Sequence, residues 1–203
     1  MSPETLQIGA VLQPDWDERP FRVIAFDDRD VMYDCWWPHK AEWCFASLSG
    51  TIAYYRVPCE LMLERCAYLR TEPLTQIELD VHRPDLPLRI ATSAQVEWPD
   101  PSRLEAFRTT LPSLESRAPL PATKLYLCPF GPKGGVKAGV LVKPEDGHAF
   151  GVAELLSFAA AIQAPLLRGA RLTRGVGLFR LGIQRRVPSY YLWGYQSRAD
   201  AQE

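Results

Sequence analysis

Five short runs rich in β-branched and aromatic residues lie near the N-terminus, and they constrain the fold more than any other stretch of the chain. Such side chains favour extended backbone, and proline or polar turn residues separate the runs. The predicted strands are Gln7–Leu12, Phe21–Phe26, Val31–Trp37, Glu42–Ser47 and Thr51–Val57. Asp27–Asp30 has a length that joins hairpin strands, and Gly50 can take the positive φ of a turn. The sequence therefore predicts a small antiparallel sheet, or an SH3-like barrel of about five strands.

The pattern changes after Pro58, where apolar residues recur at helical spacing. The further elements that we expect are a helix over 59–70, a strand over 76–81, a helix over 101–109 capped by Asp100, a hairpin of 124–130 with 136–143, a helix over 151–164, and strands over 178–184 and 190–195. This order predicts an α+β protein with two or three helices after the first sheet and a C-terminal β-rich basic region. The predicted division is a β-rich acidic region with helices over 1–110, a connector over 111–122 and a basic α+β region over 123–203, with a single packed domain as the alternative.

Composition places the chain among ordinary globular proteins, with 47% hydrophobic and 23% charged residues in 203. No apolar run approaches the roughly 20 residues of a membrane helix, and the N-terminus lacks the pattern of a signal peptide. Five cysteines form no compact framework, so we expect reduced thiols and no disulfide. These features predict a cytoplasmic protein without membrane association, and no pattern in the sequence points to a cofactor.

The net charge of −1 conceals a strong asymmetry along the chain. Residues 1–119 carry 12 Lys and Arg against 19 Asp and Glu, whereas residues 120–198 carry 11 basic residues against three acids. A separation of this size indicates a charged partner, or pairing between the two halves.

The strongest functional candidate is the basic run near the C-terminus. Between Pro165 and Arg198 there are seven arginines and no acid, with aromatic residues interleaved. Guanidinium forks fit phosphates, and aromatic faces stack on unpaired bases. The candidate nucleic-acid-binding residues are Arg168, Arg171, Arg174, Arg180, Arg185, Arg186, Tyr190, Tyr191 and Trp193. The glycine-rich segment among these basic residues resembles, over a dozen positions, that of the RNA-processing RAMP proteins. The alternative is that the arginines pair with the acidic half of the chain.

The N-terminal sheet supports a second hypothesis, a protein-interaction or inhibitory module of the immunity type. Tryptophan is common in binding hot spots, and acidic loops fit a basic partner. The candidate partner-binding residues are Trp16, Asp27, Asp28, Trp36 and Trp37.

Catalysis is the third hypothesis. A metal-dependent nuclease would need several of the N-terminal carboxylates, among them Asp27, Asp28 and Asp34, to converge on an ion. Zinc on Cys35, His39 and Cys44 would fit no common ligand spacing, and no residue nearby would activate either thiol as a nucleophile. We therefore expect a non-catalytic nucleic-acid-binding subunit or adaptor without bound metal, with the interaction module and the nuclease as alternatives.

Overall fold

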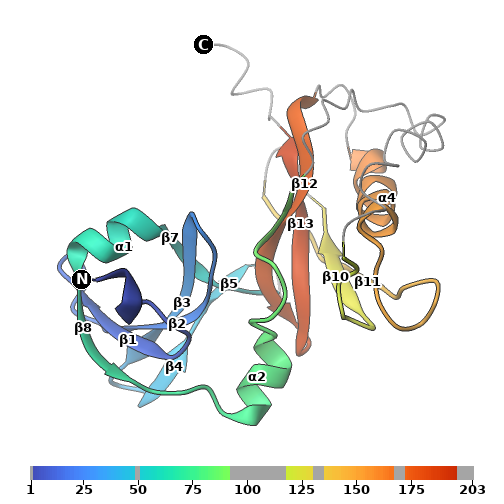
Figure 1. Cartoon of the computed structure of the whole chain (residues 1–203). Helices are drawn as coiled ribbons and strands as arrows, with labels where there is room; N and C mark the ends of the chain where they lie inside the picture. Colours follow the sequence, from blue (N-terminus) through green and yellow to red (C-terminus); the bar gives the residue numbers. More distant parts are fainter. Residues whose placement is uncertain (1, 49–50, 92–117, 130–134, 167–171, 196–203) are drawn as a thin grey trace. The chain divides into compact units, whose positions relative to one another are not determined.

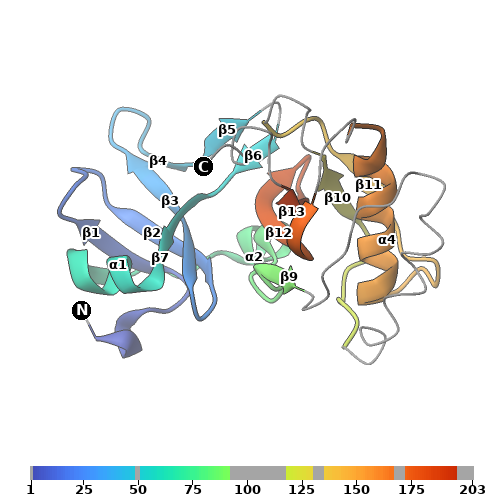
Figure 2. The ribbon, with the colours of Figure 1, turned by 90° about the horizontal axis from the view of Figure 1, so that it is seen from above.

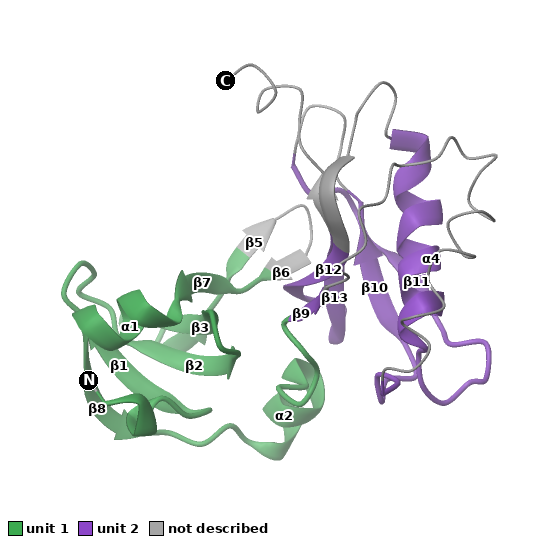
Figure 3. Cartoon of the chain, turned by 45° about the horizontal axis from the view of Figure 1, so that its top comes forward, with its two compact units in different colours: residues 1–48, 52–88 green, residues 49–51, 89–203 purple. Residues whose placement is uncertain are grey.

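The computed structural model describes residues 2–48, 51–91, 118–129, 135–166 and 172–195. The chain divides into two compact units (Figure 3). The first unit comprises residues 1–48 and 52–88, and the second comprises residues 49–51 and 89–203. Most of the predicted connector and the helix predicted over 101–109 lie outside the described residues, so both stay predictions.

The first unit is built on an antiparallel sheet with the strand order β4-β3-β2-β1-β8 (Figure 1). Its strands are β1 (Ala10–Pro14), β2 (Phe21–Phe26), β3 (Asp30–Trp37), β4 (Glu42–Cys44) and β8 (Cys66–Thr71), and β7 (Tyr55–Pro58) also pairs with β3. The predicted hairpin of β2 and β3 is confirmed, with Val23 opposite Tyr33. No pairing closes the path from β8 to β4 within the described residues, so this is an open sheet rather than the alternative closed barrel.

The other elements of the first unit are short. The 3-10 helix η1 (Pro3–Thr5) precedes β1, and α1 (Cys59–Arg65) follows β7. The predicted strands over 42–47 and 51–57 are each interrupted, which leaves β5 (Ala46–Leu48) and β6 (Thr51–Ala53) as separate strands. The interruptions fall at Phe45 and Tyr54, whose rings pack together and against His82 with centroids 5.1–5.6 Å apart. Packing of these two rings outweighs the local preference for continuous strands.

A large hydrophobic cluster of the first unit lies on one face of the sheet. Phe21, Val23 and Tyr33 are buried there, and α1 covers them with Met62. Tyr33 stacks on Phe21 with ring centroids 4.1 Å apart. Alternation along β3 assigns Tyr33, Cys35 and Trp37 to this face and Asp34 and Trp36 to the other.

The helix predicted over 59–70 is wrong in its second half. The helix ends at Arg65, and Cys66–Thr71 forms the edge strand β8, antiparallel to β1. Helical spacing alone could not reveal this, because the backbone of β8 gains its hydrogen bonds from β1, about fifty residues earlier in the sequence.

The strand predicted over 76–81 is also wrong, because this segment forms helix α2 (Gln76–His82). Thr75 accepts a hydrogen bond from the backbone N–H of Glu78, while the Glu78 carboxylate accepts one from the backbone N–H of Thr75. This capping box satisfies two amide groups at the start of the helix. Its signature, Thr-x-x-Glu, is present in the sequence and outweighs the β-branched residues that follow it.

The second unit contains a mixed sheet with α4 (Val152–Gln163) against it (Figures 1 and 2). The strand order is β11-β10-β13-β12, with β9 (Arg89–Ala91) on β12. The strands are β10 (Leu125–Cys128), β11 (Val140–Val142), β12 (Leu172–Gln184) and β13 (Val187–Tyr195). Here β10 pairs parallel with β13, and the other pairs are antiparallel. The 3-10 helix η4 (Ala164–Leu166) follows α4.

The two units together confirm an α+β protein, and the predicted strands near the C-terminus and the helix over 151–164 are confirmed. In α4, Leu155, Leu156 and Ala160 are fully buried against the sheet. Among the described helices, none has the length and apolar character needed to cross a bilayer.

Candidate functional site

The turn between β12 and β13 is the most unusual backbone feature of the second unit. Gln184 pairs with Val187, so the connection consists of Arg185 and Arg186 alone. Their φ angles are 49° and 63°, in the left-handed region that two-residue hairpin turns require and that Asn and Gly fill best. Arginine has no such preference, and each side chain in this conformation costs roughly 1–2 kcal/mol. The chain therefore holds two adjacent, exposed guanidinium groups at a strained turn.

The sheet register brings two lysines to the same end. Lys124 precedes Leu125, whose partner on β11 is Val142, and Lys143 follows Val142. In the parallel pair of β10 and β13, Tyr126 lies opposite Ser189, so Lys124 lies opposite Val187, the residue after Arg186. Neighbouring strands are about 4.8 Å apart, so these four backbone positions lie within roughly 15 Å of one another. We call Lys124, Lys143, Arg185 and Arg186 the basic cluster.

All four side chains of the basic cluster are exposed, and none forms an ion pair with a described residue. The nearest acids along the chain, Glu145 and Asp146, lie in the loop between β11 and α4. Asp146 accepts hydrogen bonds there from the backbone N–H groups of His148 and Ala149, which lower the pKa of its carboxyl group. Four neighbouring like charges that have no counter-ion among the described residues attract anions.

Several acidic residues of the first unit form ion pairs within that unit. Seven ion pairs are described, and all of them join residues between Asp15 and Asp85. Several are direct carboxylate–guanidinium contacts, such as Arg19–Asp17 at 2.6 Å and Arg70–Glu72 at 2.9 Å. These ion pairs lie within the first unit, so the alternative in which the C-terminal arginines pair with the acidic half stays a prediction.

Two of the other candidate nucleic-acid-binding residues are buried away from the basic cluster. Arg180 and Tyr190 lie opposite each other on β12 and β13, and both have no exposed surface. Tyr190 is in register with Leu127 and alternates with Leu192, and both leucines pack against α4, so Arg180 and Tyr190 lie on the face that α4 covers. Neither can touch a ligand while α4 stays in place.

Of the other seven candidates, three have described side chains. Arg185 and Arg186 are exposed, and Tyr191 is half-buried with its ring 5.5 Å from that of Phe179. Arg168 and Arg171 lie outside the described residues, and of Arg174 and Trp193 only the strand backbone is described.

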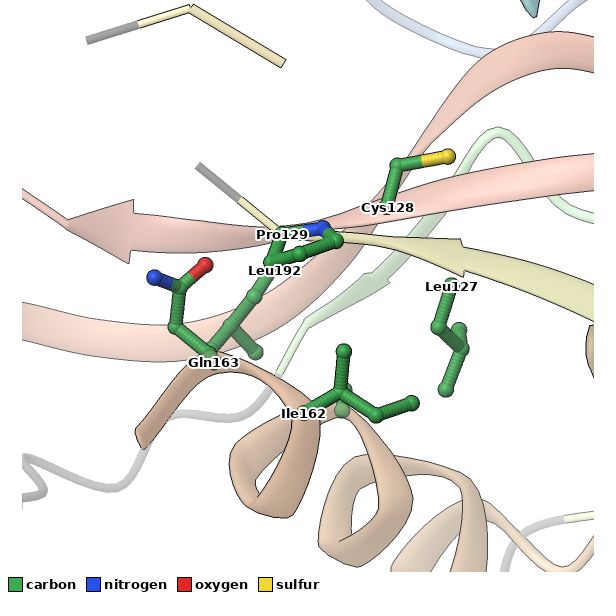
Figure 4. Close-up of a pocket in the computed structure, with 7 residues that line it drawn as sticks. Leu127, Cys128, Pro129, Ile162, Gln163 and Leu192 are labelled. Carbon is green, nitrogen blue, oxygen red and sulfur yellow. The ribbon is translucent and has the colours of Figure 1, made fainter. Parts of the chain in front are cut away.

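A small depression lies beside α4. Its empty space of about 150 Å³ includes open solvent, and it is lined by Leu127, Ile162 and Leu192 among others (Figure 4). The thiol of Cys128 lies 3.9 Å from the side-chain oxygen of Gln184, on β12.

The candidate partner-binding residues of the first unit lie at opposite ends of β3. Asp27 accepts hydrogen bonds from the backbone N–H groups of Arg29 and Asp30 and so shapes the turn before β3, where Asp28 is exposed. Trp36 and Trp37 lie at the far end of the strand, roughly 25–30 Å away along an extended backbone. Trp16 lies in the loop between β1 and β2, at the same end of the sheet as Trp36 and Trp37, because Phe21 pairs with Cys35. Asp27 and Asp28 are therefore separated from the three tryptophans.

A buried ionic network on the second face of this sheet was not predicted from the sequence. Arg22 donates to Asp34 at 2.8 Å and to Glu78 at 2.7 Å, and its guanidinium carbon lies 4.9 Å from the centre of the Trp43 ring. Burial raises the pKa of Asp34 to about 6, against the opposing hydrogen bond from Arg22. The network joins α2 to β2 and β3, and its buried groups are already engaged with one another.

No group of three or more His, Cys, Asp or Glu side chains in the described residues is arranged to hold a metal ion. All five cysteines carry free thiols. Burial raises the pKa of Cys35 to about 12 and that of Cys66 to about 11, so both stay protonated and unreactive near neutral pH.

Sequence reasoning missed Lys124 and Lys143 because both are isolated charges at the ends of predicted strands. Only the pairing of β10 with β11 and β13 brings them to the Arg185–Arg186 turn. Gln-Arg-Arg-Val between two alternating runs was a possible signal for a two-residue hairpin turn.

Comparison with known proteins gives no further information about the site: no family model, curated protein or solved structure matches this chain.

Proposed function

We propose that this protein binds nucleic acid through the phosphate backbone, using the basic cluster of the second unit. The observation that carries the proposal is the convergence of four exposed cations on one end of the sheet, two of them on a turn whose backbone disfavours arginine. Backbone strain that a sequence retains is a common mark of a functional site. Phosphates are the natural ligand of closely spaced guanidinium and ammonium groups.

The proposed mode of binding is electrostatic and non-catalytic. No described aromatic side chain of the second unit is exposed, so the described residues offer phosphate contacts rather than a surface for base stacking. Each phosphate contact releases condensed counterions, and the logarithm of the binding constant then falls linearly with the logarithm of the salt concentration. The expected slope is about 0.9 per contact on a duplex and about 0.7 on a single strand.

The proposal is tested with fluorescently labelled duplex DNA, single-stranded DNA and RNA of equal length, titrated at several salt concentrations. Lys124→Ala combined with Lys143→Ala is expected to weaken binding and to reduce the salt slope by roughly 1.4–1.8, the sum for two lost contacts. The matched control is Arg65→Ala combined with Arg70→Ala, which removes the same charge from exposed ion pairs of the first unit. Equal losses in both double variants would show a general charge effect and refute the site, as would no binding of the unmodified protein at micromolar concentration.

A further inference from the structure

The loop between β1 and β2 forms a small surface that the proposed nucleic-acid site does not use. Trp16 is 39% exposed, and its inner side packs on Phe21 with ring centroids 6.0 Å apart. Arg65, the last residue of α1, lies over the Trp16 ring at 5.2 Å and forms an ion pair with Asp15 at 2.8 Å. We call Trp16, Asp15, Glu18, Glu64 and Arg65 the Trp16 surface.

Arg65 occupies a site with the chemistry that binds a guanidinium group. An aromatic face and a carboxylate converge on it, one by stacking and the other by a charge-assisted contact. The same three-part arrangement recurs in this unit, where Arg19 contacts both Trp37 and Asp17, and Lys40 contacts both Trp37 and Glu42. The first unit thus repeatedly places a cation between a tryptophan and a carboxylate.

The Trp16 site differs from the Arg19 site because its internal cation is loosely held. The Arg65 side chain is 45% exposed and that of Asp15 is 55% exposed, whereas the values for Arg19 and Asp17 are 34% and 22%. Exposed ion pairs and exposed cation–π contacts each change an equilibrium constant by only a factor of roughly two to five. An arginine from another molecule can therefore replace Arg65 at little cost.

The Trp16 surface also carries negative charge that no described residue neutralises. Glu18 and Glu64 are exposed, flank Trp16 and Arg65 in the sequence, and form no ion pair with a described residue. A basic partner could form ion pairs with these two carboxylates in addition to stacking on the tryptophan ring. This charge complementarity selects a cationic occupant.

We propose that the Trp16 surface is a docking site for an arginine-rich segment of a partner protein, and that a partner arginine takes the position which Arg65 occupies in the free protein. Arginine is preferred to lysine because a planar guanidinium both stacks on an indole ring and meets a carboxylate with two parallel hydrogen bonds. This proposal concerns the first unit and is independent of nucleic-acid binding by the second.

The test uses a labelled ten-residue peptide of alternating arginine and glycine, with lysine–glycine and glutamate–glycine peptides for comparison, at low salt and without nucleic acid. Arg65→Ala is expected to strengthen binding of the arginine peptide about threefold or more, because it opens the Trp16 face and leaves Asp15 uncompensated. Arg70→Ala, which removes the same charge from another exposed ion pair, is expected to change affinity less than twofold. Trp16→Ala and Asp15→Asn should each weaken binding at least threefold.

Asp15→Asn keeps the shape of the loop, so it remains informative if Trp16→Ala disturbs the packing on Phe21. Equal effects of Arg65→Ala and Arg70→Ala, or equal affinity for the arginine and lysine peptides, would overturn the proposal. Self-association that Trp16→Ala abolishes, without binding of the peptide, would overturn it in favour of a second copy of the chain as the occupant.

Discussion

Replacing the strained turn separates the proposed binding role of Arg185 and Arg186 from any role in folding. Both residues have positive φ, and the two-residue turn that they form favours Asn followed by Gly. Removing two arginines from the left-handed conformation should stabilise the folded state by roughly 2–4 kcal/mol. Glycine increases the conformational entropy of the unfolded chain, which offsets about 0.5–1 kcal/mol of this gain. Arg185→Asn with Arg186→Gly should therefore raise the free energy of unfolding by roughly 1–3 kcal/mol.

The same double substitution should weaken nucleic-acid binding, because it removes half of the charge of the basic cluster. For a chain of this length, each kcal/mol corresponds to about 2–4 °C in melting temperature, so a rise of several degrees is expected. Calorimetry and urea denaturation measure the first effect, and fluorescence anisotropy at several salt concentrations measures the second. A protein that becomes more stable and binds less tightly cannot have lost binding through misfolding.

The control variant is Arg185→Lys with Arg186→Lys, which keeps both the charge and the backbone strain. It should leave stability within about 0.5 kcal/mol of the unmodified protein, as ordinary surface changes do, and should retain most of the affinity. If the Asn-Gly variant is less stable than the original, the turn is not strained as inferred. If it binds as tightly as the original, the basic cluster is not the site.

Two further predictions concern the buried network of the first unit. Glu78→Ala should destabilise the protein by roughly 2–4 kcal/mol, because it removes a helix cap and leaves buried Arg22 with one carboxylate fewer. Urea denaturation beside Asp80→Ala, an exposed change on the same helix, measures the difference, and equal midpoints would contradict it. The raised pKa of Asp34 means that the folded protein binds the proton of the Asp34 carboxyl group more tightly than the unfolded chain does. The contribution of Asp34 to the free energy of unfolding is therefore greatest below pH 4 and is lost as the pH rises to about 6. Asp34→Asn should abolish that part of the pH dependence, by roughly 2–3 kcal/mol between pH 4 and pH 6.5, and an unchanged profile would show that the carboxylate titrates normally.

The elements that could be predicted are those in which local signals agree with one another. Alternation and turn chemistry both favour the hairpin of β2 and β3, and apolar periodicity bounded by Gly151 and Pro165 gives α4. The wrong predictions concern segments in which one local signal outweighs another, or in which pairing with a strand distant in the sequence determines the secondary structure. Thr75 and Glu78 cap α2 in spite of strand-forming residues, and β1 makes β8 a strand in spite of helical spacing.

The candidate site could be predicted only in part, because burial cannot be judged from a count of charges. Seven arginines in one run look alike in the sequence, yet Arg180 is buried within the second unit while Arg185 and Arg186, a few residues later, are exposed. The turn makes this difference, since Arg180 lies within a strand on the face that α4 covers, whereas Arg185 and Arg186 form the connection beyond the ends of the strands. Lys124 is about sixty residues away in the sequence, and only the parallel register of β10 with β13 brings it to the turn.

Part of the acidic charge of the first unit is neutralised within that unit. Arg19, Arg22, Arg65, Arg70 and Arg83 form ion pairs with six of its acids at distances of 2.6–2.9 Å. The cations of the basic cluster have no described counter-ion, and holding two of them at a strained turn lowers the stability of the fold. The proposed anionic ligand would account for stability given up to keep like charges together. The turn substitution therefore tests the proposal more directly than the removal of a buried arginine would.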